Sequence, residues 1–142
     1  YFNDGLLYFV DSASSSIRVA DFTNNIVRTL AGPIENNLFA FGDIDGQIGT
    51  SRLQHPLGIS GDDEGNIYIA DTYNNTIKAI DPATTTETVY TAADTALNEP
   101  GDLYCHEGKL YIADTNNHVI RIVDLATAAI STVEITDPDQ LL

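Results

Sequence analysis

The three histidines are the residues most suited to hold a metal ion. A zinc site needs three or four nitrogen, sulfur or carboxylate ligands that converge on one point. His55 stands directly before Pro56, and His118 lies in an asparagine-rich turn, so both occupy positions that favour packing or turn roles. His106 adjoins Cys105, but two ligands do not make a site. The sequence therefore predicts no zinc centre.

A second metal-like pattern consists of Asp43, Asp45 and Gly46. Two carboxylates two residues apart, followed by a glycine for the bend, are how a calcium loop begins. No third acidic residue follows at the next alternate position, and no glutamate closes the run. Asp43 and Asp45 are therefore a weak calcium candidate beside the simpler interpretation, a plain turn. We expect no other metal and no cofactor.

Motifs for enzymatic chemistry are absent from the sequence. One cysteine, Cys105, excludes an internal disulfide and a cysteine-rich cluster. There is no Ser-His-Asp order, nucleophile elbow, phosphate-binding glycine loop or dinucleotide fingerprint. These observations favour a protein that binds over one that catalyses.

The polar residues that stand out instead recur. An aspartate appears three times, each time with a basic residue seven positions later. A catalytic group is usually needed once, so three copies indicate a structural role: each carboxylate accepts turn amides two residues on, or pairs with that basic residue. The asparagines that follow are interpreted as turn formers that tolerate positive φ. The residues are Asp11, Asp71 and Asp114, with Arg18, Lys78 and Arg121, and Asn74, Asn75, Asn116 and Asn117.

These residues belong to repeats. Three segments share a glycine, a tyrosine, the aspartate, a small polar turn and an isoleucine: 5-GLLYFVDSASSSIRVAD-21, 65-GNIYIADTYNNTIKAID-81 and 108-GKLYIADTNNHVIRIVD-124. The step from Tyr68 to Tyr111 is 43 residues, which suits one four-stranded propeller blade. Residues 67–70 are apolar at every position, so both faces of this strand must be covered. Blades packed between neighbouring blades provide that cover.

The predicted fold class is all-β, with β-propeller blades of four antiparallel strands in one domain over 1–142. Hairpins should turn near 12–15, 72–75 and 115–118, and no helix is expected beyond a single short one. The predicted blades are 1–31, 53–92 and 97–136, with a long connection at 32–52. Strands are expected at 57–61, 66–71, 76–81 and 86–92, then at 101–105, 109–114, 118–124 and 129–135. The first blade should have three strands, because residues 1–3 are no more than the end of its innermost one.

The pattern resembles NHL repeats. 55-HPLGI-59, 65-GNIYIADTYNNTIK-78 and 108-GKLYIADTNNHVIR-121 fit closely, while 5-GLLYFVDSASSSIR-18 has serines in place of asparagines. More narrowly, residues 29–59 with 111-YIADTNNH-118 resemble proteins in which a thioredoxin-like domain precedes a six-bladed NHL propeller. The resemblance implies about three blades, half of a six-bladed ring, and an association with a redox protein. This chain has no Cys-x-x-Cys motif of its own.

Half a ring leaves an apolar sheet face bare at each end, at a cost of about 25 cal/mol per Å² of apolar surface left in water. We expect either that the chain is part of a longer propeller, or, if it is complete, that a homodimer closes a six-bladed ring.

Charge limits the partners. The formal net charge is -15, with 6 basic and 21 acidic residues, so phosphate backbones and anionic lipids should be repelled. No apolar run reaches the roughly 18–20 residues that span a bilayer. We expect a soluble chain with no nucleic acid or membrane partner. The sequence leaves the cellular compartment open.

The long connection carries three large apolar residues, Leu38, Phe39 and Phe41. Our first expectation is that they pack on a neighbouring blade, and the alternative is an exposed partner loop. The function favoured by the sequence is non-catalytic: a scaffold that binds a protein, or another domain of its own polypeptide, through surface loops. The alternative is a calcium- or zinc-assisted hydrolase or lyase on a six-bladed propeller.

Overall fold

The computed structural model describes residues 1–34, 38–47, 49–81, 89–93 and 96–133, with the backbone alone considered for 89–93. These residues form three four-stranded antiparallel sheets, each in chain order apart from direction, and three single 3-10 turns. The all-β propeller-blade architecture is confirmed. The predicted strand residues 86–88 and 134–135 lie outside the described part of the chain.

The first sheet contains β1 (Phe2–Asn3), β2 (Leu6–Asp11), β3 (Ser16–Asp21) and β4 (Ile26–Ala31). The second contains β5 (Gly58–Gly61), β6 (Ile67–Asp71), β7 (Thr76–Ile80) and β8 (Val89–Ala93). The third contains β9 (Pro100–His106), β10 (Lys109–Asp114), β11 (Val119–Asp124) and β12 (Ile130–Thr132). The first sheet thus has a fourth strand, although β1 pairs with β2 only at Leu6 and Leu7.

The middle hairpin of each sheet turns in the same way. A 3-10 turn follows the second strand, at Ser12–Ser14, Thr72–Asn74 and Thr115–Asn117. The next residue has left-handed backbone angles, with φ of 51° at Ser15, 58° at Asn75 and 58° at His118. This conformation suits asparagine and costs other residues more. The tight turn sets β2 against β3, β6 against β7 and β10 against β11.

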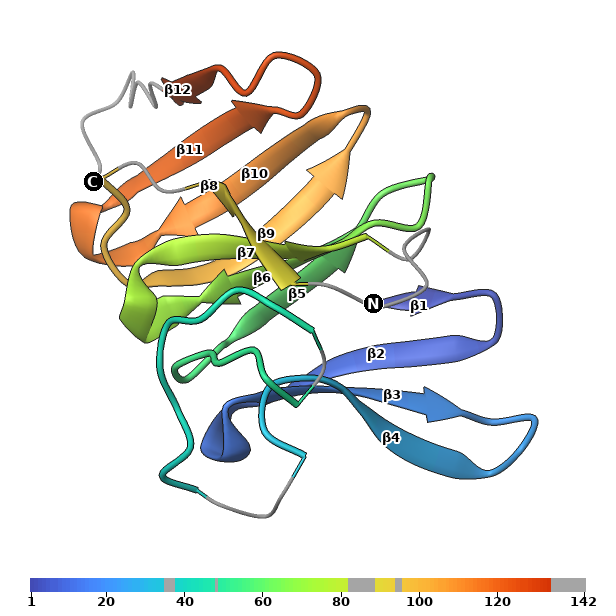
Figure 1. Ribbon diagram of the computed structural model, residues 1–142. Coiled ribbons are helices and arrows are strands. Elements are labelled where there is room, and N and C mark those ends of the chain that lie inside the picture. Colours follow the sequence, from blue (N-terminus) through green and yellow to red (C-terminus); the bar gives the residue numbers. More distant parts are fainter. Residues whose placement is uncertain (35–37, 48, 82–88, 94–95, 134–142) are drawn as a thin grey trace, which may run out of the picture.

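The sheets stack face to face in chain order, the second between the first and third (Figure 1). One apolar cluster joins the first and second sheets, and a second cluster joins the second and third. Both faces of the central sheet are therefore buried, as its continuously apolar strands require. The first cluster contains Ile17, Val19, Leu30, Ala31, Leu53, Ile67, Ile69 and Ile80. The second contains Tyr68, Ala70, Ile77, Ala79, Leu97, Leu103, Cys105, Leu110, Ile112 and Val123.

The innermost strands of the second and third sheets, β5 and β9, approach each other closely at Gly58. A Cβ atom built there would lie 2.7 Å from the Cα atom of Asp102 and 3.1 Å from the backbone nitrogen of Leu103. Backbone atoms cannot rotate away, so a larger residue would force β5 and β9 apart. At Gly101 the Cβ atom would meet the Thr115 hydroxyl at 2.7 Å, and that side chain can move.

We therefore expect Gly58→Ala to lower the free energy of unfolding by about 1–3 kcal/mol through overpacking. Gly101→Ala, in the corresponding strand of the next sheet, should cost clearly less. Chemical denaturation of both variants measures the difference. Equal losses would contradict a rigid backbone contact at Gly58.

Candidate functional site

Asp71, at the end of β6, is fully buried and fixes the segment that leads into its own sheet. Its Oδ1 accepts the backbone N–H of Gln54 at 2.7 Å, and its Oδ2 accepts Nδ2 of Asn74 at 2.7 Å. The carbonyl of Gln54 accepts the N–H of Tyr73 at 3.1 Å. Gln54, two residues before Pro56, is thus bound through both backbone groups. We call the residue at this position the lead-in residue.

The third sheet repeats this arrangement. Oδ1 of the buried Asp114 accepts the N–H of its lead-in residue Asn98 at 2.8 Å, and Oδ2 accepts Nδ2 of Asn117 at 2.8 Å. The N–H of Asn116 donates to the Asn98 carbonyl at 3.1 Å. Arg121 completes the cluster, with Nε 3.0 Å from Oδ2 of Asp114.

The sequence interpretation of these side chains needs two corrections. Neither Asp71 nor Asp114 accepts a backbone N–H of its own turn; the backbone N–H that each accepts comes from the lead-in residue. Of the four asparagines, Asn75 alone has positive φ, and His118 takes that place in the third turn. Asn74 and Asn117 act through their side-chain amides, and Asn116 through its backbone. The lead-in residues Gln54 and Asn98 were missed, although both stand two residues before a proline.

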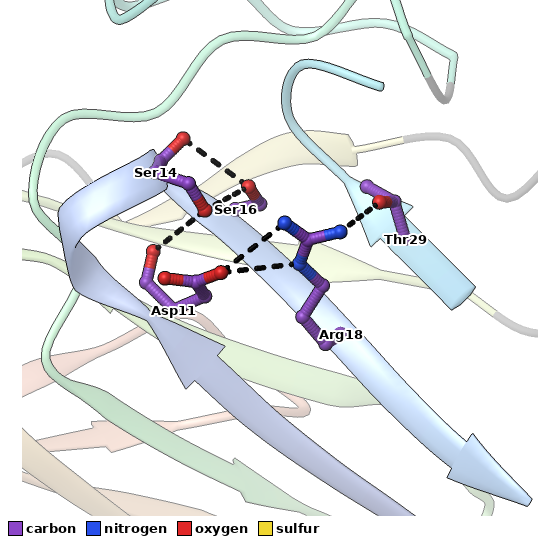
Figure 2. Close-up of polar contacts among 5 residues, drawn as sticks. All are labelled: Asp11, Ser14, Ser16, Arg18 and Thr29. Atoms are coloured by element: carbon purple, nitrogen blue, oxygen red, sulfur yellow. Dashed lines mark hydrogen bonds and ion pairs between the residues drawn. The ribbon is translucent and has the colours of Figure 1, made fainter. Parts of the chain in front are cut away.

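The first sheet has the same aspartate in a more open setting. Figure 2 shows Arg18 between Asp11 and Thr29. The Nε and Nη2 atoms of Arg18 each lie 3.2 Å from Oδ2 of Asp11, and its Nη1 donates to the Thr29 hydroxyl at 2.8 Å. The Asp11 side chain is 34% exposed, whereas that of Asp114 is fully buried. Burial raises the pKa of Asp11, but hydrogen bonds with Ser14 and Arg18 outweigh it and lower the pKa below its ordinary value.

The first two turns also hold the lead-in of the following sheet. The first-turn hydroxyl of Ser12 donates to the carbonyl of Pro56, and that of Thr72 donates to Pro100 at 2.9 Å. The fourth turn residue accepts the N–H directly before the proline. His55 donates to Ser15 Oγ at 3.2 Å, and Glu99 donates to Asn75 Oδ1 at 2.7 Å. The two lead-in segments at Gln54 and Asn98 are therefore each fixed from two sheets.

Lys78 differs from the corresponding Arg18 and Arg121, because it binds two carboxylates of the long connection. Its side chain is 1% exposed, and its Nζ donates to Oδ1 of Asp43 at 2.5 Å and of Asp45 at 2.7 Å. The two weak calcium candidates thus bind an internal ammonium group. Burial lowers the pKa of Lys78, but the hydrogen bonds to both carboxylates outweigh burial and raise it above its ordinary value.

Backbone hydrogen bonds extend this anchor along the long connection. Asn74 Nδ2 donates to the Gly42 carbonyl at 2.7 Å, and the Gly42 N–H donates to Leu53 at 3.0 Å. Ile44 and Arg52 exchange two backbone hydrogen bonds of 3.1 and 2.9 Å. The contacts of Asn74 and Lys78 thus fix the long connection against the second sheet.

The apolar residues of this connection stay largely outside the core. Exposed fractions are 58% for Leu38, 84% for Phe39 and 50% for Phe41. Packing on a neighbouring blade, our first expectation, is therefore wrong. Leu38 and Phe41 border a groove of about 280 Å³. Residues of the first two turns and of the lead-in segment of the second sheet form its other walls: Ser12, Ala13, Ser15, Gln54, His55 and Tyr73. We call residues 38–41 the aromatic loop.

His55 and Cys105, two other candidates for chemistry, lie in packed surroundings. The His55 ring stacks on Tyr73 with centroids 4.6 Å apart. The described residues contain no group of three His, Cys, Asp or Glu side chains placed to hold a metal ion. Cys105 is buried, and desolvation, followed by the charges of Asp62 and Asp63, raises the pKa of its thiol. A thiol with a raised pKa is a poor nucleophile at neutral pH.

The structure has three four-stranded blades of NHL type, which are joined by the contacts of their lead-in segments. This architecture defines a repeat protein of the β-propeller class, and the anchored aromatic loop lies on its surface. The chain belongs to the family described as "Repeat of unknown function (DUF6923)", whose model matches residues 2–140. It is 40% identical over 112 residues to "NHL repeat-containing protein 2" of Bos taurus, an alignment that covers 68% of this chain and 15% of that protein.

Solved structures agree on the fold. A protein of unknown function from Bacteroides thetaiotaomicron has a TM-score of 0.72 at 21% identity, over 84% of this chain and 32% of that one. Virginiamycin B lyase from Staphylococcus aureus has a TM-score of 0.62 at 17% identity, over 95% of this chain and 39% of the lyase. At these identities the likeness extends to the fold alone. The described residues contain no helix long and apolar enough to cross a membrane.

The anchor at Lys78 predicts a specific effect of Lys78→Met. Two carboxylates would lose their buried cation, so we expect a loss of about 1–2 kcal/mol in stability, moderated because both are partly exposed. Hydrogen exchange of residues 38–46 should become faster. Arg121→Met also removes an ion pair but touches no residue of the connection, and should leave exchange there unchanged. Unchanged exchange in both variants would contradict the anchor.

Asp71 predicts a pH dependence. Burial raises its pKa from 3.8 to about 6, against the lowering effects of Gln54, Asn74 and Lys78. The folded chain therefore binds a proton that the unfolded chain releases between about pH 4 and 6, so this group adds stability as pH falls through 6. Between pH 7 and pH 5, the free energy of unfolding of the wild type should rise by about 1 kcal/mol relative to that of Asp71→Asn. The difference in free energy of unfolding between the wild type and Asp114→Asn should not change over this range, because the pKa of Asp114 is lowered.

Proposed function

We propose that this chain is a non-catalytic binding unit, and that the aromatic loop and the groove beside it contact another protein or another domain. The observation that carries the proposal is an anchored loop that presents Leu38, Phe39 and Phe41 largely to solvent. Several large apolar side chains gathered on one surface segment mark an interaction site more often than scattered ones do.

The aromatic loop is already held in place without a partner. A loop that is already held loses little conformational entropy on binding, and this favours affinity. Here Lys78 and Asn74, both from the second blade, hold Asp43, Asp45 and Gly42 directly after the aromatic loop. Loops fixed on a rigid scaffold are where repeat proteins commonly carry specificity.

The groove indicates the form of the partner. Leu38 and Phe41 on one side and the stacked His55 and Tyr73 on the other can enclose an apolar side chain. The net charge of -15 disfavours an anionic partner. We therefore propose a protein surface with an apolar side chain in a neutral or basic setting.

The sequence resemblance supports a finer proposal, that the partner is a thioredoxin-like domain of a redox protein. Its support is the likeness of residues 29–59 and 111–118 to proteins with that domain order, together with the identity to NHL repeat-containing protein 2. The chain spans about 15% of that relative's length. The buried thiol of Cys105 makes this chain a poor redox group, so redox chemistry would belong to the partner.

Photo-crosslinking tests the proposal. A benzoylphenylalanine replaces Phe39, cross-linked proteins are identified from the source cells, and each is purified and titrated with the unmodified chain. Phe41→Ser should weaken its binding about tenfold or more, as expected for an aromatic contact at an interface. Phe22→Ser, which alters a 60% exposed phenylalanine in the β3–β4 turn, is the matched control and should have no effect.

Equal weakening by Phe41→Ser and Phe22→Ser would contradict a site at the aromatic loop, and so would a purified partner that does not bind. A thioredoxin-like partner with the expected dependence on Phe41 supports both proposals. A different partner with that dependence supports the binding site and contradicts the redox association.

A further inference from the structure

The side chain of Asn74 links the buried Asp71 to the long connection. Its Nδ2 donates to Oδ2 of Asp71 at 2.7 Å and to the carbonyl of Gly42 at 2.7 Å. A side-chain amide nitrogen carries two hydrogens, and these two contacts use both. Gly42 directly follows Phe41, the last residue of the aromatic loop. One side chain therefore connects a buried carboxylate to the residue beside this loop.

The third sheet contains the same relay with a different basic residue. Nδ2 of Asn117 donates to Oδ2 of Asp114 at 2.8 Å and to the carbonyl of Ala96 at 2.8 Å. Arg121 adds a hydrogen bond of 3.0 Å from its Nε to the same carboxylate. In the second sheet Lys78 occupies the position of Arg121, but it gives its Nζ to two carboxylates of the long connection.

This difference changes how readily the two aspartates take up a proton. Burial raises the pKa of Asp71 to about 6, its two hydrogen bonds and the charge of Lys78 offset only part of that effect, and the charge of Asp43 adds to it. For Asp114 the hydrogen bonds, including that of Arg121, outweigh burial and lower the pKa. Asp71 therefore changes its charge near pH 6, whereas Asp114 stays ionised there.

The other ionisable groups around Asp71 keep their roles over this range. Burial lowers the pKa of Lys78, but its hydrogen bonds to Asp43 and Asp45 outweigh burial and raise it, so the ammonium group stays charged. The lead-in segment and the turn beside Asp71 also carry His55 and Tyr73, whose rings stack on each other at the groove. Asp71 itself accepts hydrogen bonds from Gln54 and Asn74, which are both neutral.

A proton on Asp71 reverses the direction of one of these hydrogen bonds. A carboxylic acid needs an acceptor for its O–H. The backbone N–H of Gln54 cannot accept, but the Asn74 amide can rotate and present its Oδ1 instead of its Nδ2. The rotated amide then turns an oxygen toward the carbonyl of Gly42, and the hydrogen bond that held Gly42 is lost.

We propose that Asp71, Asn74 and the Gly42 carbonyl form a proton-operated latch on the long connection. With Asp71 ionised, the latch holds Gly42; with Asp71 protonated, it releases Gly42 while Lys78 keeps its contacts. The aromatic loop is then less restrained and loses more conformational entropy on binding, so a partner binds more weakly as the pH falls. This last step rests on the proposed function, whereas the latch itself does not.

Nuclear magnetic resonance of the full chain tests the latch without a partner. Between pH 7 and pH 5, the side-chain amide of Asn74 and the carbonyl carbon of Gly42 should shift together, with a midpoint at about pH 6. The side-chain amide of Asn117 is the internal control and should not shift, because Asp114 stays ionised. Asn74 and Gly42 signals that do not titrate overturn the latch, and so do signals that titrate together with Asn117.

Asp71→Asn imitates the protonated acid, because it is neutral and still has an oxygen for the Gln54 N–H. At pH 7 its Gly42 signal should already lie where the wild-type signal lies at pH 5, and it should stay there. Asp114→Asn, the matched control, should leave the Gly42 signal as in the wild type. Both variants keep His55, so a histidine contribution is the same in all three chains. The wild-type titration decides if Asp71→Asn does not fold.

The partner found by cross-linking at Phe39 tests the effect on binding. At pH 7 the wild type should bind it about three- to tenfold more tightly than Asp71→Asn does, which corresponds to one lost hydrogen bond. At pH 5 the two affinities should be equal. A ratio that is the same at both pH values contradicts control of binding by the latch. Binding that does not depend on Phe41 contradicts the proposed function instead, and the wild-type titration still decides the latch.

Discussion

The buried aspartate that ends the second strand of the second and third sheets is the interaction on which the stacked arrangement depends. A carboxylate removed from water is costly unless hydrogen bonds and charges compensate it. Asp71 and Asp114 both accept a backbone N–H of the segment that leads into the same sheet. For Asp114 the hydrogen bonds outweigh the cost of burial and lower its pKa, whereas for Asp71 they offset only part of that cost. The cost of burial therefore fixes where each blade begins relative to its own second strand. A short motif within one hairpin thus controls a contact 16 or 17 residues away.

The neighbouring turn adds a second constraint, because its hydroxyl and its fourth residue bind the next lead-in segment. Each lead-in is shared between two sheets, so neither blade can shift without breaking hydrogen bonds in the other. The two apolar clusters supply stabilisation without direction, whereas these polar contacts set the register of one blade on the next. The same set of contacts joins the first sheet to the second and the second sheet to the third.

Two differences between the repeats change the contacts that they make. Arg121 turns to its own aspartate, but the shorter Lys78 binds Asp43 and Asp45 of the long connection. One basic residue thereby serves the loop that presents Leu38, Phe39 and Phe41. The first turn carries serines where the others carry asparagines, and its aspartate is the most open of the three. The first of these departures lies at the aromatic loop, which we propose as the binding site.

The sequence alone determined the blades. Continuous apolar strands, glycine and asparagine turns and the recurring aspartate are local signals, because they report backbone preference and burial within a hairpin. The partners of those aspartates were decided by tertiary structure. Gln54 and Asn98 contribute backbone amides, which any residue could supply, so their side chains carry little trace of the role. The same holds for the aromatic loop. Its composition suggested packing, but its side chains are largely exposed, and the Lys78 contacts with Asp43 and Asp45 beside it join residues more than thirty positions apart. Contacts between distant segments depend on how blades stack, and a linear pattern does not contain that geometry.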